Sequence, residues 1–334
     1  MKFLIVGLGS MGKRRIRNLL ALGYSNVIGF DSRNDRRIES ERNYHVKTYS
    51  TIHEALKTKP NAMIISTPPN LHAKYANIAI RNDIHFFTEV NLSSSDIDRI
   101  VKKIKRKNII GVPSCTMIFH PVIKQLKKVL EKQEIGKILA IYHHFGHYLP
   151  DWHPWEDYRN FYVSKRKTGA AREIVPFELV WLRYLFPRIK SVYANVKKIS
   201  KLDADIDDIY QILFELENKI LCNMTVDVIS RPSIKETKII GEKGTIICDY
   251  NAGEIRINKG KDWRIVKIKM GKVAPGYKGN TAPESLYEEE IQSFIFAIGK
   301  KKKYPHTFED ELEMLKTLDS IEDSSKKGKK MLLN

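Results

Sequence analysis

Residues 2–12 read Lys-Phe-Leu-Ile-Val-Gly-Leu-Gly-Ser-Met-Gly, an apolar run of strand length that leads directly into the glycine spacing Gly-x-Gly-x-x-Gly. The next segment, to Leu22, has apolar residues at helical spacing, so the order predicts a strand, a turn and a helix. In such a turn Gly7 permits the sharp bend, Gly9 lets the backbone approach a pyrophosphate, and Gly12 lets the helix pack closely against the strand. The helix start offers free N–H groups and the positive end of its dipole to phosphates. This stretch therefore predicts a dinucleotide-binding turn.

A second apolar run, residues 27–30, ends at Asp31. A carboxylate at this place accepts hydrogen bonds from both ribose hydroxyls of the adenosine, which favours NAD because a 2′-phosphate would meet a negative charge. Basic and polar residues follow directly, and an arginine here is the usual partner of a 2′-phosphate, so NADP stays an alternative. The same residues also fit the solvated start of a helix. They are Ser32, Arg33, Arg36 and Arg37.

The length of 334 residues predicts two domains. No run of eighteen or more apolar residues is present, and the chain starts directly with a strand, so we expect a soluble cytoplasmic protein without a membrane partner. Three widely spaced cysteines, Cys115, Cys222 and Cys248, agree with reduced thiols in that compartment.

The formal net charge is +19, from 58 basic and 39 acidic residues. The lysines are spread along the chain rather than gathered with aromatic residues, so we expect no nucleic-acid partner. The alternative is a basic protein that associates with nucleic acid. Binding to nucleic acid that persists at physiological salt would support this alternative, because purely electrostatic association weakens steeply there. Runs such as Lys300–Lys303 fit solvated helix ends. The positive field would attract acidic small molecules such as nucleotide sugars.

Short strands alternate with helices over residues 1–118, which predicts a doubly wound parallel sheet in a first domain. The expected strands are 2–6, 27–31, 62–66, 84–88 and 109–112, and the expected helices are 11–22, 51–57, 71–82 and 94–107. Ligands of such sheets bind at the carboxyl ends of the strands, so the residues after each strand are the candidates for contact.

Longer alternating segments fill residues 119–334 and predict a mostly antiparallel open sheet with helices on one face, an α+β domain following the α/β domain. A helix is expected to about residue 131, and two more at 285–297 and 308–325. The expected strands are 137–147, 192–199, 208–217, 220–229, 238–241, 245–249, 254–258 and 264–268.

Several separated motifs together resemble the Gfo/Idh/MocA oxidoreductases, the family of glucose-fructose oxidoreductase and inositol dehydrogenase. They are GLGSMG at 7–12, IISTPPNLH at 64–72, FTEVNL at 87–92, HP at 120–121, GKI at 136–138, WHPWEDYR at 152–159 and IIGEKGTI at 239–246. The resemblance implies a Rossmann domain followed by a sheet domain that binds substrate and often builds the oligomer. It also implies NAD(P)-dependent hydride transfer to or from a hydroxyl-bearing carbon of a sugar, nucleotide sugar or polyol.

The glycine turn, the strand ends and these motifs together define the expected cofactor site. It comprises Gly7, Leu8, Gly9, Ser10, Met11, Gly12, Asp31, Ser32, Arg33, Thr67, Pro68, Asn70, His72, Glu89 and Asn91.

The chain departs from the family pattern where the resemblance implies catalytic residues. Members usually carry a lysine in a Glu-Lys-Pro motif, and here Val90 stands in its place. The helix that usually carries an Asp and a His four residues apart has Glu173 and Phe177 at those places, and an alignment slip of one residue puts Glu178 at the His place. Since the alcohol needs a base as hydride leaves, the candidates for that role are other titratable groups. They are Glu173, Glu178, His153 and Tyr158.

Aromatic residues surround His153, and sugar faces stack on such surfaces, while nearby arginines can hold a carboxylate or phosphate. The expected substrate contacts are Trp152, His153, Arg159 and Arg172, unless this segment is an interface between domains or subunits. Four histidines raise the question of a metal site: His143, His144, His147 and His153. Along the expected strand only His143 and His147 share a face, and they lie too far apart to bind one metal ion. We therefore expect no metal.

The leading hypothesis is an oxidoreductase with atypical catalytic residues. The alternative is a redox-silent relative that binds a dinucleotide or sugar as a sensor or partner subunit. A broad sheet with one uncovered face also predicts a homodimer or homotetramer.

Overall fold

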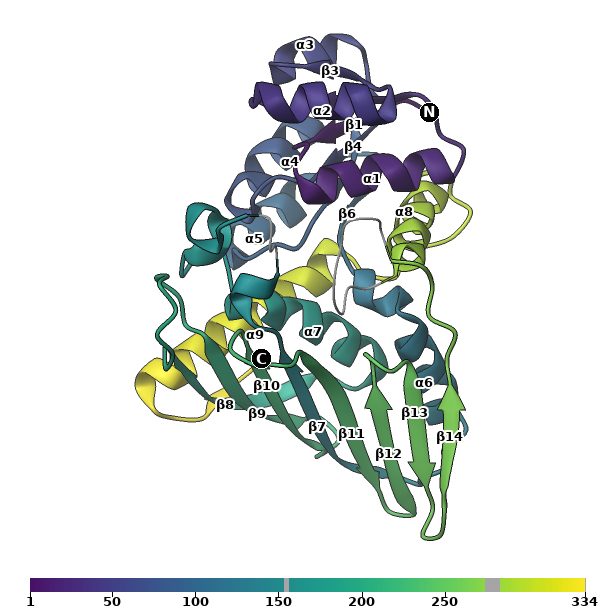
Figure 1. The fold of residues 1–334 in the computed structure, drawn as a ribbon, viewed down its shortest axis with the longest axis vertical. Coiled ribbons are helices and arrows are strands. Elements are labelled where there is room, and N and C mark those ends of the chain that lie inside the picture. Colours follow the sequence, from purple (N-terminus) through teal and green to yellow (C-terminus); the bar gives the residue numbers. More distant parts are fainter. Residues whose placement is uncertain (153–155, 274–282, 334) are drawn as a thin grey trace. The chain divides into compact units, whose positions relative to one another are not determined.

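The computed structural model describes residues 1–152, 156–273 and 283–333, which form two compact units (Figure 1). The first unit comprises Met1–Thr116 and Glu284–Leu315, and the second comprises Met117–Pro283 and Lys316–Asn334. From the sequence we predicted one domain boundary after residue 118, with all later residues in a second domain. In the structure the chain returns to the first unit, because side chains of residues 284–290 form ion pairs with the helix that follows the glycine turn.

The first unit contains a parallel six-stranded sheet, as predicted, in the order β3-β2-β1-β4-β5-β6. In this order the strands are β3 (Lys47–Tyr49), β2 (Val27–Phe30), β1 (Phe3–Val6), β4 (Ala62–Ile65), β5 (His85–Thr88) and β6 (Gly111–Pro113). All residues of β1 and β4 are buried, so both faces of the sheet are covered at its centre. The short polar strand β3 was not predicted, because its three residues lack the apolar run of its neighbours.

Helices connect these strands: α1 (Ser10–Ala21), α2 (Asn34–Tyr44), α3 (Ile52–Lys57), α4 (His72–Arg81) and α5 (Ser94–Ile104). Helix α8 (Glu284–Ile298) and the first part of α9 (Phe308–Lys327) complete the unit. Ser93 caps α5 by accepting a hydrogen bond from the Asp96 N–H, since a Ser side chain satisfies a free N–H of the first turn. Helix α1 differs because its N-cap is Gly9, which has no side chain to cap the first turn.

The second unit contains a nine-stranded sheet in the order β14-β13-β12-β11-β7-β10-β9-β8-β15, in which only β7 and β10 pair in parallel. The strands are β7 (Ile138–Gly146), β8 (Ile189–Lys197), β9 (Ile209–Leu216), β10 (Leu221–Asp227), β11 (Ile234–Gly241), β12 (Gly244–Asp249), β13 (Glu254–Asn258), β14 (Trp263–Lys267) and β15 (Met331–Leu332). The mostly antiparallel sheet is confirmed. Strand β11 begins four residues earlier than predicted.

One face of this sheet is covered by helices and the other carries exposed apolar side chains. Helix α7 (Ala171–Leu185) packs on β9 and β10, and α6 (Pro121–Glu131) packs on β13 (Figure 1). On the opposite face Tyr193, Leu213 and Tyr142 lie in one row of the register and are 40%, 52% and 49% exposed. None of the helices in the described ranges has the length and apolar character needed to cross a membrane.

Candidate functional site

The glycine turn between β1 and α1 leaves no room for side chains at two of its positions. Gly7 has a φ of +91°, and a Cβ there would lie 2.7 Å from the Ser66 carbonyl oxygen. A Cβ on Gly12 would lie 1.8 Å from the Gly7 carbonyl oxygen, so the helix packs on the turn as only glycine allows. At Gly9 the nearest atom to a Cβ would be Arg36 Nη1 at 3.4 Å. The turn is therefore a bare main-chain surface with one arginine beside it.

Asp31 is held at this turn by main-chain donors. Its Oδ2 accepts from the Leu8 N–H at 2.8 Å and its Oδ1 from the Arg33 N–H at 2.9 Å, and the residue is buried. Arg36 Nη1 lies 3.7 Å from Oδ2. The neighbouring Arg37 donates instead to the carbonyl oxygen of Asp31 at 2.8 Å. Of the arginines after β2, Arg36 is thus the one beside both the carboxylate and the glycine turn, while the Arg33 side chain pairs with Asp35.

The loops after β4 and β5 are tied together by buried polar side chains. His72 Nε2 lies 2.8 Å from the Thr67 carbonyl oxygen, and its Nδ1 lies 3.1 Å from Asn91 Oδ1. Burial lowers the pKa of His72. Pro68 and Asn70 lie at the 3₁₀ turn Pro69–Leu71 that leads into α4. His72 and Asn91, expected as cofactor contacts, make these hydrogen bonds with each other and with the loop.

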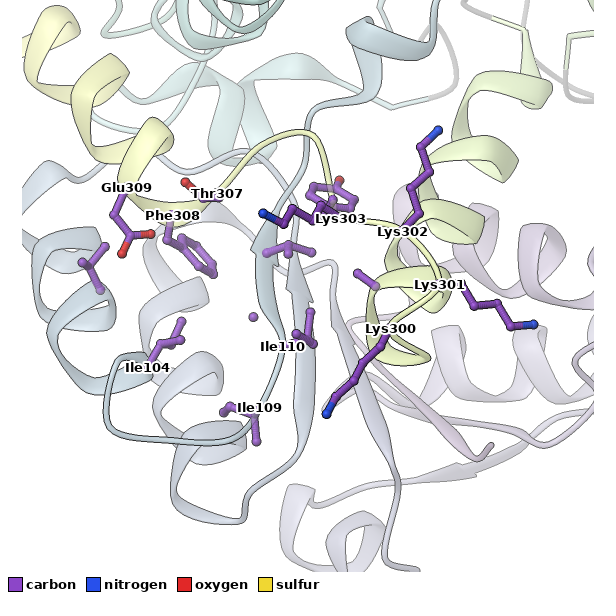
Figure 2. Close-up of a pocket in the computed structure, with 15 residues that line it drawn as sticks. Ile104, Ile109, Ile110, Lys300, Lys301, Lys302, Lys303, Thr307, Phe308 and Glu309 are labelled. Atoms are coloured by element: carbon purple, nitrogen blue, oxygen red, sulfur yellow. The ribbon is translucent and has the colours of Figure 1, made fainter.

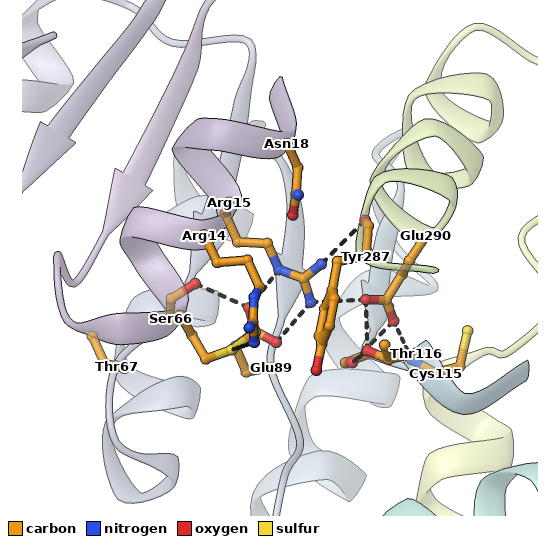
Figure 3. A network of polar contacts seen from close by, with 12 residues as sticks. Arg14, Arg15, Asn18, Ser66, Thr67, Glu89, Cys115, Thr116, Tyr287 and Glu290 are labelled. Carbon is orange, nitrogen blue, oxygen red and sulfur yellow. Dashed lines mark hydrogen bonds and ion pairs between the residues drawn. The ribbon is translucent and has the colours of Figure 1, made fainter. Parts of the chain in front are cut away.

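Glu89 is fixed by a buried arginine (Figure 3). Its two oxygens accept from Nε and Nη2 of Arg15, each at 2.8 Å, and Ser66 Oγ donates to it at 3.0 Å. Arg15 Nη2 also donates to Glu290 Oε2 at 2.7 Å. Burial alone would lower the pKa of Arg15, but the charges of Glu89 and Glu290 outweigh it and raise that pKa. Next to Glu89, the Val90 side chain is buried and has no exchangeable proton.

The first unit therefore fits a dinucleotide. The glycine turn offers main-chain N–H groups, and Asp31 lies directly beside it. Thr67 lies beside the turn, because its Cγ2 atom is 3.1 Å from the position of a Gly7 Cβ. Its hydroxyl oxygen, Oγ1, is buried and has no hydrogen-bond partner among the described residues. A buried donor of this kind normally has a partner, and a ligand at the turn would supply it.

In the second unit, six side chains form a buried polar group that we call the Glu178 cluster. Its members are Glu178, Trp181, His143, Lys235, Thr237 and Tyr250. Glu178, on α7, is 1% exposed. Its Oε1 accepts from Lys235 Nζ at 2.7 Å, and its Oε2 accepts from Trp181 Nε1 at 2.7 Å.

A chain of hydrogen bonds continues from Glu178 through His143. His143 Nε2 lies 2.9 Å from Glu178 Oε2, and its Nδ1 lies 2.8 Å from Thr237 Oγ1, which in turn lies 3.1 Å from the Tyr250 hydroxyl. Burial lowers the pKa of His143, so the ring is neutral and carries one proton. With that proton on Nε2, toward the carboxylate, Nδ1 accepts from Thr237.

The cluster keeps Glu178 ionised. Burial alone would raise the pKa of Glu178, but the charge of Lys235 and the hydrogen bonds from His143 and Lys235 outweigh it and hold that pKa at about 2. Burial and the charge of Lys235 lower the pKa of His120, the residue before α6, to about 3. The Glu178 carboxylate is thus kept charged within a mostly uncharged interior.

The other residues expected at the catalytic site take different places in the second unit. Glu173, near the start of α7, accepts from the Tyr162 hydroxyl at 3.0 Å. The Tyr158 hydroxyl accepts from the Asp203 N–H at 3.2 Å. His153 lies outside the described residues. Glu178 is fully enclosed, so the alternative of a carboxylate on a solvated helix face is wrong for this residue.

The expected substrate contacts are mostly paired within the unit. Trp152 Nε1 donates to the His147 carbonyl oxygen at 3.0 Å. Exposed Arg159 pairs with Asp157 at 2.6 Å, and Arg172 pairs with Glu322 at 2.6 Å. Across the described ranges, no group of three or more His, Cys, Asp or Glu side chains is arranged to hold a metal ion.

Lys235 was not among the expected site residues, and His143 was considered only as a metal ligand. A signal was present: Lys235, Thr237 and Ile239 alternate along β11, and the last two are fully buried, so the lysine occupies an inward-facing position. A lysine at such a position needs a buried partner. Only the packing of α7 on the sheet shows that the partner is Glu178.

A separate apolar cavity of about 670 Å³ lies in the first unit beside β6 (Figure 2). It is lined by Ile104, Ile109 and Ile110, with Lys300–Lys303 along the loop after α8. Residues 109–111 precede or start β6, whereas the glycine turn follows the carboxyl end of β1. None of the expected cofactor residues lines this cavity, so it is distinct from the glycine turn.

Two parts of the chain match descriptions of one family. Residues 1–113 match "Oxidoreductase family, NAD-binding Rossmann fold", and residues 123–247 match "GFO/IDH/MocA C-terminal domain". Myo-inositol 2-dehydrogenase of Thermotoga maritima is 27% identical over 143 residues. The matched segment is 41% of this chain and 42% of that enzyme's length.

Solved structures resemble the whole chain. Levoglucosan dehydrogenase in complex with NADH superposes with a TM-score of 0.84 at 19% identity, covering 100% of this chain and 99% of that one. An oxidoreductase from Agrobacterium radiobacter in complex with NAD+, L-tartaric acid and magnesium superposes with a TM-score of 0.87 at 14% identity. That match covers 100% of this chain and 98% of the other chain. At these identities the likeness establishes the fold.

Proposed function

Because this chain belongs to the Gfo/Idh/MocA family of NAD-binding oxidoreductases, we propose that it transfers hydride between NAD and a hydroxyl-bearing carbon of a sugar, nucleotide sugar or polyol. The observation that carries the proposal is the glycine turn, where bare main chain, the uncapped start of α1 and the fixed Asp31 carboxylate lie together. This arrangement suits a pyrophosphate and the adjoining ribose.

In the proposed complex, main-chain N–H groups of the turn hold the pyrophosphate, and Asp31 accepts hydrogen bonds from the ribose hydroxyls. Thr67 Oγ1 gains the partner that it lacks among the described residues. Arg36 lies where it can pair with a phosphate, which leaves NADP as a second cofactor. The nicotinamide ring, when bound, takes up or returns the hydride.

The substrate class rests on relatives, not on contacts in this chain. The aligned relative from Thermotoga maritima is named for a polyol, and levoglucosan dehydrogenase for an anhydrosugar. The net charge of +19 supports an acidic substrate such as a nucleotide sugar. Glu178, one of the candidate acid–base residues, is buried and has a pKa held at about 2 by the charge of Lys235 and by its hydrogen bonds, and such perturbed groups are typical of functional sites.

The redox-silent alternative has one observation in its favour, the buried Val90 at the place where the resemblance implies a lysine. A sensor or partner subunit would bind the dinucleotide without turning it over. The two functions therefore differ in turnover and not in cofactor binding.

The test is a titration of the purified protein with NADH and NADPH, followed by turnover assays with myo-inositol, levoglucosan, free sugars and nucleotide sugars. Tight NADH binding with turnover of one class supports the proposal. Binding without any turnover supports the redox-silent relative, and failure to bind either nucleotide overturns both.

We also propose that two or four copies assemble through the exposed sheet face that carries Tyr142, Leu213 and Tyr193, since a row of large apolar side chains is more stable when covered. Sedimentation of the wild type and of a Tyr142→Lys/Leu213→Lys variant tests this, and a monomeric wild type would overturn it. The three buried free thiols, Cys115, Cys222 and Cys248, agree with a cytoplasmic location.

A further inference from the structure

We propose that the apolar cavity beside β6 binds a small amphipathic anion, a molecule with an apolar chain and one carboxylate, at a site separate from the glycine turn. The inference goes beyond the proposed function and does not depend on it. Every residue that lines this cavity belongs to the first unit. The site is therefore built entirely within one compact unit.

The size and walls of the cavity suit an apolar chain. Its volume of about 670 Å³ lies within the range of roughly 300–1,000 Å³ that is typical of small-molecule sites. The walls include Val101 and Ile104 of α5, Ile109 and Ile110 before β6, and Phe308 of α9. Moving an apolar chain from water into such surroundings is favourable in proportion to the apolar area that is covered.

One side of the cavity is formed by four consecutive exposed lysines, Lys300–Lys303, in the loop after α8. Among the described residues their ammonium groups have no ion-pair partner, and that of Lys301 lies 5.8 Å from the centre of the Phe296 ring. The acidic residue of the lining, Glu309, lies 3.6 Å from Lys105 on another element. Like charges gathered in one loop create a positive field, which favours an anion at this side of the cavity.

The end of α8 determines the direction in which Lys300 leaves the helix. The Lys301 N–H donates to the Phe296 carbonyl oxygen at 2.9 Å, and the Lys300 N–H donates to the Ala297 carbonyl oxygen at 3.1 Å. These two bonds close the helix with Lys300 in the left-handed region, at a φ of +55°. The backbone that carries this side chain is thus fixed by hydrogen bonds to the helix.

The four lysine side chains do not point the same way. Figure 2 shows Lys300 and Lys303 extending toward the apolar walls, whereas Lys301 and Lys302 extend away from them. Two ammonium groups are therefore placed to pair with a carboxylate whose chain lies in the cavity, and two adjacent lysines of the same loop are not.

A ligand that suits both parts of the site needs an apolar chain and an anionic group. A nucleotide or a free phosphate would bring polar groups against the apolar walls, which is costly without hydrogen-bond partners. An uncharged hydrocarbon would leave the ammonium groups without a partner. A carboxylate at the end of an apolar chain forms charge-assisted hydrogen bonds with the lysines while its chain is removed from water.

The test uses octanoate as the probe, in isothermal titration calorimetry of the whole chain. Octanol has the same chain without the charge, octyltrimethylammonium has the opposite charge, and acetate has the charge without the chain. We expect octanoate to bind at least about tenfold more tightly than each of the three. Failure of octanoate to bind overturns the proposal, and so does equal binding of octanol, which would show that the lysines contribute nothing.

Two double variants with the same change in net charge test the position of the carboxylate. Lys300→Glu/Lys303→Glu should raise the octanoate Kd by at least about tenfold, because both groups that face the cavity are reversed. Lys301→Glu/Lys302→Glu is the matched control and should change that Kd by less than about threefold. Equal losses in the two variants would mean that only the overall charge acts, which overturns the site.

Competition with NADH separates this site from the glycine turn. Saturating NADH should leave the octanoate Kd unchanged, and displacement of octanoate by NADH overturns the proposal. Octanoate binding by a protein that does not bind NADH would refute the proposed function and leave this site standing.

Hydrogen exchange of the wild type, followed by mass spectrometry, covers the case in which the variants do not fold. Octanoate should slow exchange in peptides from residues 101–112 and 297–309, which line the cavity, and leave β7 with its exposed Tyr142 unchanged. Slowing confined to other peptides overturns the proposal. Sedimentation tests a second copy as the occupant: a dimer of the wild type that dissociates in Lys300→Glu/Lys303→Glu would overturn the small anion in favour of another chain.

Discussion

Both carboxylate oxygens of Glu89 accept hydrogen bonds from Arg15, at 2.8 Å from Nε and 2.8 Å from Nη2, and the arginine is completely buried. Arg15 lies on α1, directly behind the glycine turn, and Glu89 follows the carboxyl end of β5. Glu290 of α8 neutralises the arginine from its other side at 2.7 Å. One guanidinium group thus fixes α1 against two separate parts of the first unit.

Replacing this arginine should cost much of the stability of the first unit. In Arg15→Met the buried Glu290 and the half-buried Glu89 lose their counter-charge. Removing one partner of a buried ion pair costs about 3–5 kcal/mol. Urea denaturation should show this loss. The exposed pair of Arg33 and Asp35 is the matched control, and Arg33→Met should change the free energy of unfolding by less than about 1 kcal/mol. Equal effects of the two variants would contradict the interpretation.

Gly12→Ala should abolish tight nucleotide binding. The new Cβ would lie 1.8 Å from the Gly7 carbonyl oxygen, so α1 has to move away from the turn. We expect the NADH Kd to rise by at least tenfold, or about 1.4 kcal/mol, in isothermal titration calorimetry. Gly299→Ala is the control, since its Cβ would meet no atom closer than 3.6 Å. Normal NADH binding by the Gly12→Ala variant would show that close packing of α1 is not needed.

Asp31 and Arg36 should set the choice between NADH and NADPH. Asp31→Asn removes the negative charge that a 2′-phosphate would meet, so the ratio of the NADPH Kd to the NADH Kd should fall by about tenfold. Arg36→Ala should weaken NADPH binding more than NADH binding, because its guanidinium group lies 3.7 Å from the Asp31 carboxylate. Fluorescence titrations with both nucleotides measure these ratios. Unchanged ratios in both variants would place the discriminating residue elsewhere.

His120 should make the second unit less stable in mild acid. Its pKa is lowered from 6.5 to about 3 by burial and by the charge of Lys235. The unfolded chain therefore binds a proton between pH 6.5 and 3 that the folded chain excludes, and stability falls as the pH drops below 6.5. At pH 5 this histidine alone accounts for a loss of about 2 kcal/mol.

His120→Asn isolates this contribution. Asparagine keeps an acceptor for the Val122 N–H at the N-cap of α6 and does not titrate. The fall in unfolding free energy between about pH 6.5 and pH 5, measured with urea, should be smaller in this variant. Exposed His45 is the control position, and His45→Asn should leave the fall unchanged. If the unfolding free energy of His120→Asn falls between these pH values by as much as that of the wild type, this histidine is not the source of the decrease.

The sequence predicted most elements of the fold because their signals are local. The strand of residues 3–6 is a continuous apolar run. In the turn after it, the positive φ of Gly7 and the close approach of Gly12 to the Gly7 carbonyl oxygen are local reasons for glycine. The capping of α5 by Ser93 is equally local. Strand β3 was not predicted, because it is a strand through its pairing with β2 and its own composition gives no strand signal.

The polar networks could not be predicted, because they join residues that are far apart in the chain. Arg15 meets Glu290 across 275 positions, and Lys235 meets Glu178 across 57. No spacing rule relates such residues, since their contact depends on which helix packs on which sheet. For the same reason the return of residues 284–315 to the first unit was not anticipated.

The sequence by itself determined the glycine turn, the parallel sheet and the alternation of the second sheet, because backbone sterics and hydrophobic periodicity act over a few residues. It also determined that the lysine implied at position 90 is absent. Only the tertiary structure decided which charges neutralise each other, and it enclosed Glu178 with Lys235 rather than leaving it in solvent. Burying a charge is costly unless a partner is packed against it, and only the assembled fold provides that partner.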